Sequence, residues 1–166
     1  LNLALGAILG LLLCIGYAVV RSIVDRRLRS PGEVERRFGV PTIGRLPVST
    51  IATDTGLLVT DSIEQESFGI GESFRRLRSN LSYMNVDDPP RVIVVTSARP
   101  RDGKSTTAAN LAAAMSLSGQ PVTLVDGDLR RPSVADKLGL VEGAGLTDVL
   151  IGQVELADVL QEHSLF

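Results

Sequence analysis

The fold is decided by Arg91-Val-Ile-Val-Val-Thr-Ser-Ala-Arg-Pro-Arg-Asp-Gly-Lys-Ser-Thr106, in which an apolar run leads into a polar loop. The run over residues 91–96 is rich in β-branched side chains and predicts a short strand. Residues 105–118 are rich in alanine and predict a helix, and residues 122–126 predict a second strand. Both predicted strands are apolar throughout, as buried parallel strands are. The order of strand, loop, helix and strand therefore predicts an α/β fold with a parallel sheet.

The loop carries Gly103-Lys104-Ser105-Thr106 directly before the predicted helix. A phosphate loop needs backbone N–H groups at a helix N-terminus, a lysine for the β- and γ-phosphates and a hydroxyl for magnesium. Lys104 and Ser105 fit the last two requirements. The P-loop pattern is imperfect in one place, because its first glycine would fall at Ala98. A strand before the loop and a helix after it still favour a phosphate-binding site.

An acidic motif, Asp126-Gly-Asp128-Leu-Arg130, follows the second predicted strand. Ligands of open α/β sheets bind outside the carboxyl ends of the strands, so we expect both acids to face the same site as Lys104. There they could hold magnesium through water or accept a proton. The alternative is a solvated turn at a strand end, which a neighbouring phosphate loop makes less favoured.

A further predicted helix spans residues 71–84, where Phe74, Leu77, Leu81 and Met84 recur at helical spacing. It carries three charged side chains spaced by three residues, which places them on one face: Glu72, Arg75 and Arg78. Spacing alone favours a solvated face, on which intrahelical ion pairs contribute about 0.2–0.5 kcal/mol each.

The first 20 residues contain no charged side chain, and the chain has a mean hydropathy of +0.21 although 22% of its residues are charged. About 20 residues at roughly 1.5 Å each approach the thickness of a bilayer's hydrocarbon core. Positive charge directly after a span keeps that side in the cytoplasm, and a signal peptide is disfavoured because basic residues follow the run. Residues 1–22 thus predict a transmembrane helix. The arginines that follow its uncharged run of 20 residues are Arg21, Arg26, Arg27, Arg29, Arg36 and Arg37.

Residues 23–68 are predicted to be a juxtamembrane helix and linker. Ser30, Pro31 and Glu33 fit the N-cap, the first position and the capping-box acid of a short helix that ends at Gly39. Small and acidic residues dominate positions 49–67 and predict a flexible linker.

Residues 69–166 are expected to be the N-terminal part of the P-loop domain. Because the chain starts with Leu1 and stops at Phe166 without a closing signal, we expect a fragment. Its net charge of −2 gives no footprint for nucleic acid. The single cysteine, Cys14, excludes an internal disulfide, and the single histidine, His163, forms no metal-binding pattern.

Four features in this order resemble the bacterial tyrosine kinases of capsule and exopolysaccharide synthesis, whose relatives include polysaccharide co-polymerases. In that family a Walker A loop is followed by D-x-D-x-R, which Asp126, Asp128 and Arg130 match. The segment Glu72-Ser-Phe-Arg-Arg-Leu-Arg78 looks like the family's E-x-x-R-x-x-R oligomerisation motif. The predicted span, with its Pro-rich exit, resembles the second membrane helix of a Wzz-type chain-length anchor.

The resemblance implies an ATP-dependent protein tyrosine autokinase that regulates polysaccharide polymerisation, chain length and export. It implies an inner-membrane homo-oligomer, arranged as a ring, that contacts the polymerase and export machinery. It implies catalytic roles for Lys104, Asp126 and Asp128 and metal contacts from Ser105 and Asp126, and which acid is the base stays open. A third acidic motif and a tyrosine cluster are expected beyond Phe166, so this fragment alone should be inactive. The residues implied to bind ATP with Mg²⁺ are Arg101, Asp102, Gly103, Lys104, Ser105 and Thr106.

The family usually has glycine at the position of Arg101. If this position needs a positive φ, a side chain costs about 1 kcal/mol or more and weakens nucleotide binding. Arg101 thus supports an alternative function, a non-catalytic membrane scaffold whose nucleotide domain governs assembly of a chain-length regulator. A third possibility is a partition-type ATPase. It is disfavoured by the predicted span and because Arg99 stands where the K-G-G-x-G-K loop has its signature lysine.

Overall fold

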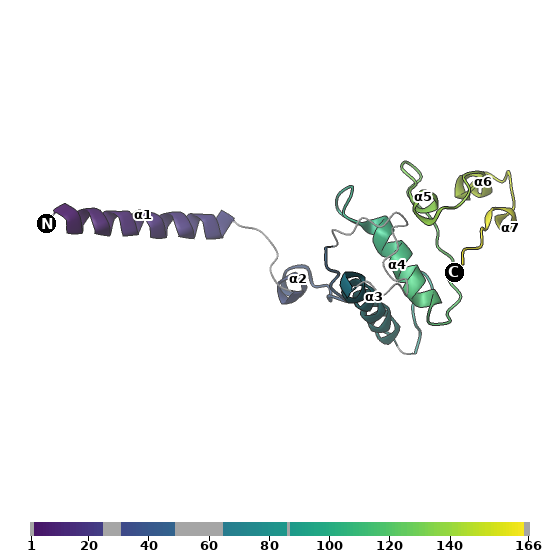
Figure 1. Cartoon of the computed structure of the whole chain (residues 1–166), viewed down its shortest axis with the longest axis horizontal. Helices are drawn as coiled ribbons and strands as arrows, with labels where there is room; N and C mark the ends of the chain where they lie inside the picture. The colour runs from purple at the N-terminus through teal and green to yellow at the C-terminus, as the bar shows by residue number, and fades with distance from the viewer. Residues whose placement is uncertain (1, 25–30, 49–64, 86, 165–166) are drawn as a thin grey trace. The chain divides into compact units, whose positions relative to one another are not determined.

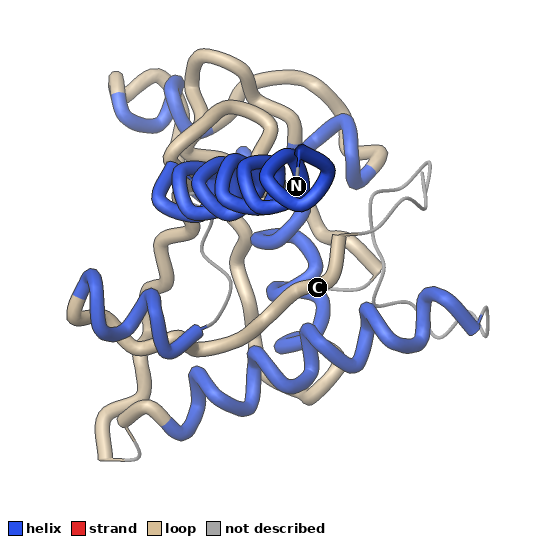
Figure 2. Tube along the Cα trace, turned by 90° about the vertical axis from the view of Figure 1, so that its left-hand side faces the viewer, coloured by secondary structure: helices blue, strands red, loops and turns tan. Residues whose placement is uncertain are grey.

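The computed structural model describes residues 2–24, 31–48, 65–85 and 87–164 (Figure 1). The chain divides into two compact units, Leu1–Thr42 and Ile43–Phe166. Over the described residues, the backbone consists of helices and loops (Figure 2).

The first unit contains helices α1 (Asn2–Val24) and α2 (Pro31–Phe38). Helix α2 begins and ends as predicted: Gly39 has a φ of +68°, and its N–H donates to the carbonyl of Glu35 at 2.9 Å. Ser30, the predicted N-cap, lies outside the described residues.

Helix α1 covers the predicted apolar helix and ends two residues later than the predicted span. Within the described part of the chain, no helix combines the length and the apolar character that a bilayer crossing requires. Leu1 lies outside the described residues, and the transmembrane assignment of residues 1–22 stays a prediction.

Helix α3 (Gln65–Tyr83) opens the structured part of the second unit. It begins six residues before the predicted start, so the linker predicted for residues 49–67 is wrong at its last three positions. The remainder of that linker, residues 49–64, lies outside the described residues. The helix extends because Ile70 is buried and adds a turn to the apolar stripe of Phe74 and Leu81.

Helix α4 (Lys104–Ser116) follows the phosphate loop and packs against α3. Its predicted bounds of 105–118 are confirmed to within two residues. The alanines at positions 109, 112, 113 and 114 are buried, and their small side chains allow close approach of the larger apolar residues of α3. This contact forms the core of the second unit and fixes the helix that begins at Lys104.

The two predicted strands, residues 91–96 and 122–126, are loops in the structure, so this prediction is wrong for the described residues. Ile93 and Leu124 pack against the core formed by α3 and α4. The alternate side chains are open to solvent, with Val92 and Val94 exposed by 83% and 82%. A strand of a parallel sheet needs hydrogen-bonded neighbours and cover on both faces, and helices cover only one face of these segments.

Three short helices complete the second unit: α5 (Val134–Leu138), α6 (Leu146–Leu150) and α7 (Leu156–Val159). Val134 and Leu138 are buried and belong to the same core as α3 and α4. Helix α5 is therefore held beside α4, and the loop that joins the acidic motif Asp126–Arg130 to α5 must pass close to the phosphate loop.

Candidate functional site

The phosphate loop lies between the extended segment 92–96 and the start of α4. Gly103 has a φ of +87°, and its carbonyl accepts the N–H of Thr107 at 2.8 Å, which begins the helical hydrogen-bond pattern. Lys104 and Ser105 are therefore the first two residues of the helix, where backbone N–H groups lack partners within the helix. This geometry provides N–H donors, a lysine and a hydroxyl at one place, as phosphate binding requires.

The loop is shaped by its own side chains. The Asp102 carboxylate accepts the N–H of Arg99 at 3.0 Å, and the Ser97 hydroxyl donates to the Arg99 carbonyl at 2.9 Å. Asp102, which was predicted to bind nucleotide, thus holds the turn before the helix. Arg101 has a φ of +67°, so this position does adopt the left-handed conformation that glycine tolerates best.

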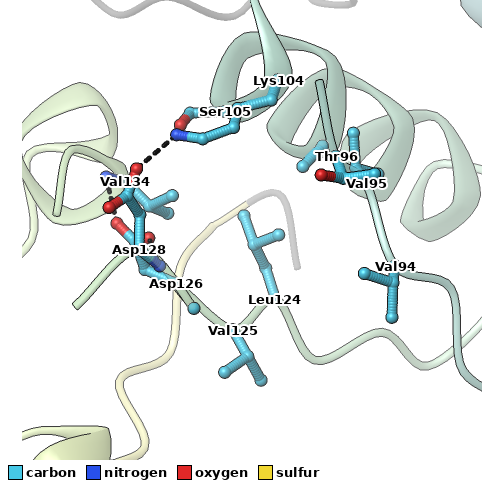
Figure 3. A pocket seen from close by; sticks show the side chains of 12 residues that line it. Val94, Val95, Thr96, Lys104, Ser105, Leu124, Val125, Asp126, Asp128 and Val134 are labelled. Atoms are coloured by element: carbon cyan, nitrogen blue, oxygen red, sulfur yellow. Dashed lines mark hydrogen bonds and ion pairs between the residues drawn. The ribbon is translucent and has the colours of Figure 1, made fainter. Parts of the chain in front are cut away.

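The Lys104 side chain extends to the acidic motif Asp126–Arg130. Its Nζ donates to Oδ2 of Asp128 at 2.5 Å, and these side chains are 36% and 30% exposed (Figure 3). This hydrogen bond is the main cause of the lowered pKa of Asp128. Burial acts in the opposite direction and raises the pKa, whereas hydrogen bonds from the backbone N–H groups of Arg131 and Arg130 lower it further. Asp128 is accordingly an ionised carboxylate at neutral pH, facing the lysine of the phosphate loop.

Asp126 has a different set of contacts. Its Oδ2 accepts the N–H groups of Ser133 at 2.8 Å and Val134 at 3.0 Å, and its Oδ1 accepts the N–H of Asp128 at 3.0 Å. Its carboxylate therefore ties the loop 127–133 to the start of α5. The bond to Asp128 is a local turn that the D-x-D spacing could suggest. No sequence pattern predicted the hydrogen bonds from the N–H groups of residues 133 and 134 to Asp126.

A cleft of about 930 Å³ opens between the phosphate loop and the loop before α5. Asp128 is the single acidic residue of its lining. The basic residues of the lining are Arg99, Arg101, Lys104, Arg130, Arg131 and Lys137. An adjoining cavity of about 350 Å³ is lined by Ser105, Asp126 and Asp128 together with Thr96 and apolar residues. Figure 3 shows the Lys104 side chain extending from the start of α4 to the Asp128 carboxylate. The positive lining suits a polyphosphate, because such sites concentrate anions.

Sequence analysis missed two basic residues of this cleft, Arg131 and Lys137. Arg131 follows the acidic motif directly, and Lys137 lies on α5. Both reach the cleft because Asp126 draws the start of α5 toward the motif, and this contact could not be read from spacing.

The donor set can be tested against Mg²⁺. The described residues contain no group of three or more His, Cys, Asp or Glu side chains that could hold a metal alone. Magnesium at phosphate sites typically uses one or two protein oxygens, while phosphate oxygens and water supply the rest. The Ser105 hydroxyl and the Asp128 carboxylate, which both line the 350 Å³ cavity, fit such a partial site. Asp126 fits it less well because three N–H groups already occupy its carboxylate.

The three charged residues of the predicted oligomerisation motif separate on α3. Glu72 pairs along the helix with Arg76, whose Nε lies 3.2 Å from Oε1, and with Arg75 at 3.8 Å. Arg78 turns to α4 and donates from Nη1 to the carbonyl of Ala114 at 3.1 Å. Arg76 was not predicted, although its spacing of four from Glu72 is a standard ion-pair spacing.

A family model and two solved structures support a P-loop NTPase fold. A ParA family model, described as NUBPL iron-transfer P-loop NTPase, matches residues 85–156. Two solved structures share the fold. The chimerical protein CapA2B2 gives a TM-score of 0.70 at 31% identity, over 82% of this chain and 56% of that structure. The BceF tyrosine kinase domain gives a TM-score of 0.64 at 29% identity, over 83% of this chain and 59% of that structure.

The sequence relatives narrow the class to bacterial tyrosine-protein kinases. Tyrosine-protein kinase YwqD of Bacillus subtilis is 40% identical over 90 residues, which is 54% of this chain and 38% of the relative. Putative tyrosine-protein kinase EpsB of Ralstonia nicotianae is 29% identical over 171 residues, 96% of this chain and 22% of the relative. The resemblance stated from the motifs is thereby confirmed: the homologues of this chain are bacterial tyrosine kinases. The chain spans only 22–38% of the length of these two relatives.

Proposed function

We propose that this chain provides the nucleotide-binding part of an ATP-dependent protein tyrosine autokinase that acts in polysaccharide polymerisation, chain-length control and export. The observation that carries the proposal is the meeting of Lys104 and Asp128, at 2.5 Å, across a positively lined cleft at the start of α4. Kinase relatives with this fold support phosphoryl transfer over simple nucleotide binding.

The contacts suggest a division of roles. N–H groups at the start of α4 and the Lys104 ammonium hold the phosphates, while the Ser105 hydroxyl contacts Mg²⁺, which would neutralise phosphate charge when bound. Asp128 is the better candidate for the base that accepts the proton of a tyrosine hydroxyl, because its carboxylate borders the cleft, whereas three backbone N–H groups occupy the carboxylate of Asp126. Asp126 acts mainly by holding the loop that carries Asp128, with water-mediated contact to Mg²⁺ as its second role.

The proposal is tested on the full-length protein in two separate measurements. Calorimetric titration with ATP and Mg²⁺ measures nucleotide binding, and incubation with labelled ATP followed by phosphotyrosine detection measures transfer. Binding and transfer together support the kinase, whereas binding of ATP without any phosphotyrosine favours the non-catalytic scaffold. Absence of both overturns the nucleotide site itself.

The scaffold is retained as a second candidate because of one observation. Arg101 adopts a φ of +67°, a conformation that costs a residue with a side chain about 1–2 kcal/mol. If the loop relaxes from this conformation in solution and must return to it on binding, a strained loop binds nucleotide less tightly than a loop with glycine.

We expect Arg101→Gly to tighten ATP binding by up to about tenfold, equivalent to about 1.4 kcal/mol, because glycine adopts this φ without a Cβ penalty. Calorimetry on the full-length protein provides the measurement. Arg101→Ala is the matched control, since it removes the same charge and keeps the Cβ. If the glycine and alanine variants bind ATP equally well, strain at this position does not limit binding.

A membrane anchor over residues 1–22 is a separate proposal that rests on the sequence. The support is an uncharged run of 20 residues followed by a cluster of arginines. The same reasoning favours the cytoplasmic side for the P-loop unit, and the resemblance implies that the membrane is the inner membrane. Assembly into a homo-oligomeric ring and contact with the polymerase and export machinery are proposed from the family resemblance. The two solved structures support that resemblance through their similar fold.

The topology gives a direct test. We expect a reporter enzyme that works only in the cytoplasm to be active when it is fused after Arg37, because six arginines between positions 21 and 37 oppose translocation across the membrane. Replacement of these arginines by glutamine is the control and should weaken the orientation preference. A reporter after Arg37 that works only outside the inner membrane would show that the predicted orientation is wrong.

A further inference from the structure

At the end of α4, backbone N–H groups of the following turn bond to the carbonyls of Met115 and Ser116, whereas none of them bonds to the carbonyl of Ala114. In a continuing helix the N–H of Ser118 would bond to the carbonyl of Ala114. Here that N–H bonds to the carbonyl of Met115 at 3.1 Å, and the chain turns away at Gly119, whose φ is +84°. Ala114 is only 1% exposed, so its carbonyl needs a donor from the protein.

Arg78 supplies that donor from a different helix. Its Nη1 lies 3.1 Å from the Ala114 oxygen, in a partly buried position between α3 and α4. A guanidinium also suits this place electrostatically, because the C-terminal end of a helix carries partial negative charge. Arg78 therefore closes the end of α4 that is opposite the phosphate loop.

The other charged residues of the motif have no such contact with α4. Glu72 and Arg75 pair with each other along α3, and their side chains are 40% and 38% exposed. These two residues present charge on the surface of the subunit, where a second copy of the chain could reach them.

We propose that Arg78 is a positioning residue within its own subunit, which fixes α4 and through it the phosphate loop. The assembly role that the resemblance implies for the motif then rests on Glu72 and Arg75. The 13 residues of α4 form a rod of about 20 Å, with Arg78 at one end and Lys104 at the other. Arg78 holds this end of α4 against α3, so we expect its loss to let α4 shift against α3 and to move the N–H groups and the lysine at the start of α4. The inference rests on the proposed function only in assigning nucleotide phosphates to the start of α4.

The test compares three variants of the full-length protein. Arg78→Met removes the charge and the donor and keeps most of the aliphatic stem, Arg78→Lys keeps charge and a donor, and Arg75→Met removes the matched charge one turn away. For each variant, calorimetry gives the ATP dissociation constant, hydrogen exchange reports the amides of residues 110–117, and light scattering gives the assembly mass.

We expect Arg78→Met to weaken ATP binding about tenfold and to speed exchange in the last turns of α4. Arg78→Lys should recover most of both losses, which general destabilisation by a lost side chain would not do. Arg75→Met should lower the assembly mass and leave ATP affinity within about twofold, a difference well below the tenfold expected for Arg78.

Different results would contradict the role of Arg78 and the proposed function. If Arg78→Met lowers the assembly mass while ATP affinity and exchange stay unchanged, Arg78 acts between subunits and the inference is wrong. Unchanged behaviour in all three measurements also overturns it. If the unmodified protein binds no ATP, the proposed function fails, and the exchange of α4 still decides whether Arg78 holds that helix.

Discussion

Lys104→Met is expected to reduce ATP affinity by at least about a hundredfold, equivalent to about 2.7 kcal/mol, and to abolish autophosphorylation. Lys104 provides the ammonium at the first residue of α4, where loop N–H groups can hold the same phosphates. Methionine also leaves the Asp128 carboxylate without its counter-ion, so that a negative charge faces the incoming phosphates. Calorimetry on the full-length protein with ATP and Mg²⁺ measures the loss.

Lys137→Met is the matched control for this variant. Lys137 carries the same charge and borders the same cleft from α5, away from the start of α4. If the cleft binds ATP only through its general positive charge, both variants should lose similar affinity. Normal binding of ATP by the Lys104 variant would show that the phosphate-loop assignment is wrong.

The phosphate loop and its helix could be predicted from sequence because the signals for them are local. Gly103, Lys104 and Ser105 are adjacent in the chain, and glycine before an alanine-rich segment is enough to place a helix start. The limits of α3 were less accurate, since Gly69 and Gly71 disfavour helix locally. Burial of Ile70 against the core outweighs that preference.

The segments 91–96 and 122–126, which were predicted as strands, could not be assigned from local signals. Val92 and Val94 have high strand propensity, but propensity does not provide neighbouring strands or cover on a second face. The contacts that decide a sheet are non-local, and composition of a short run cannot reveal them.

Contacts between residues far apart in the sequence also decide the roles of the acidic motif and of Arg78, and local spacing does not reveal them. Spacing placed Asp126 and Asp128 beside the phosphate loop, and the structure brings both to the cavity next to Lys104. Spacing could not separate their roles, because the difference lies in the N–H groups of residues 133 and 134. Likewise, the i, i+3 pattern of α3 gave no sign that Arg78 would contact Ala114, 36 residues later.

Asp128→Asn is expected to keep ATP affinity within about threefold of the unmodified protein while lowering tyrosine phosphorylation by about 10²–10⁴-fold, the range that general base catalysis contributes. Asparagine has nearly the same shape as aspartate, but its amide cannot accept the tyrosine proton and carries no charge for Mg²⁺. Loss of the carboxylate also frees Lys104 from its ion pair, which favours phosphate binding. Calorimetry and phosphotyrosine detection on the full-length protein separate these two effects.

Asp126→Asn provides the comparison that assigns the two acids. An asparagine has one carbonyl oxygen and an amide donor, so it cannot accept all three N–H groups that the Asp126 carboxylate binds. We therefore expect Asp126→Asn to lower the thermal unfolding midpoint, whereas Asp128→Asn should leave that midpoint nearly unchanged. If instead Asp126→Asn folds as stably as the unmodified protein and loses transfer, while Asp128→Asn retains it, Asp126 is the base and Asp128 serves only as the counter-ion of Lys104.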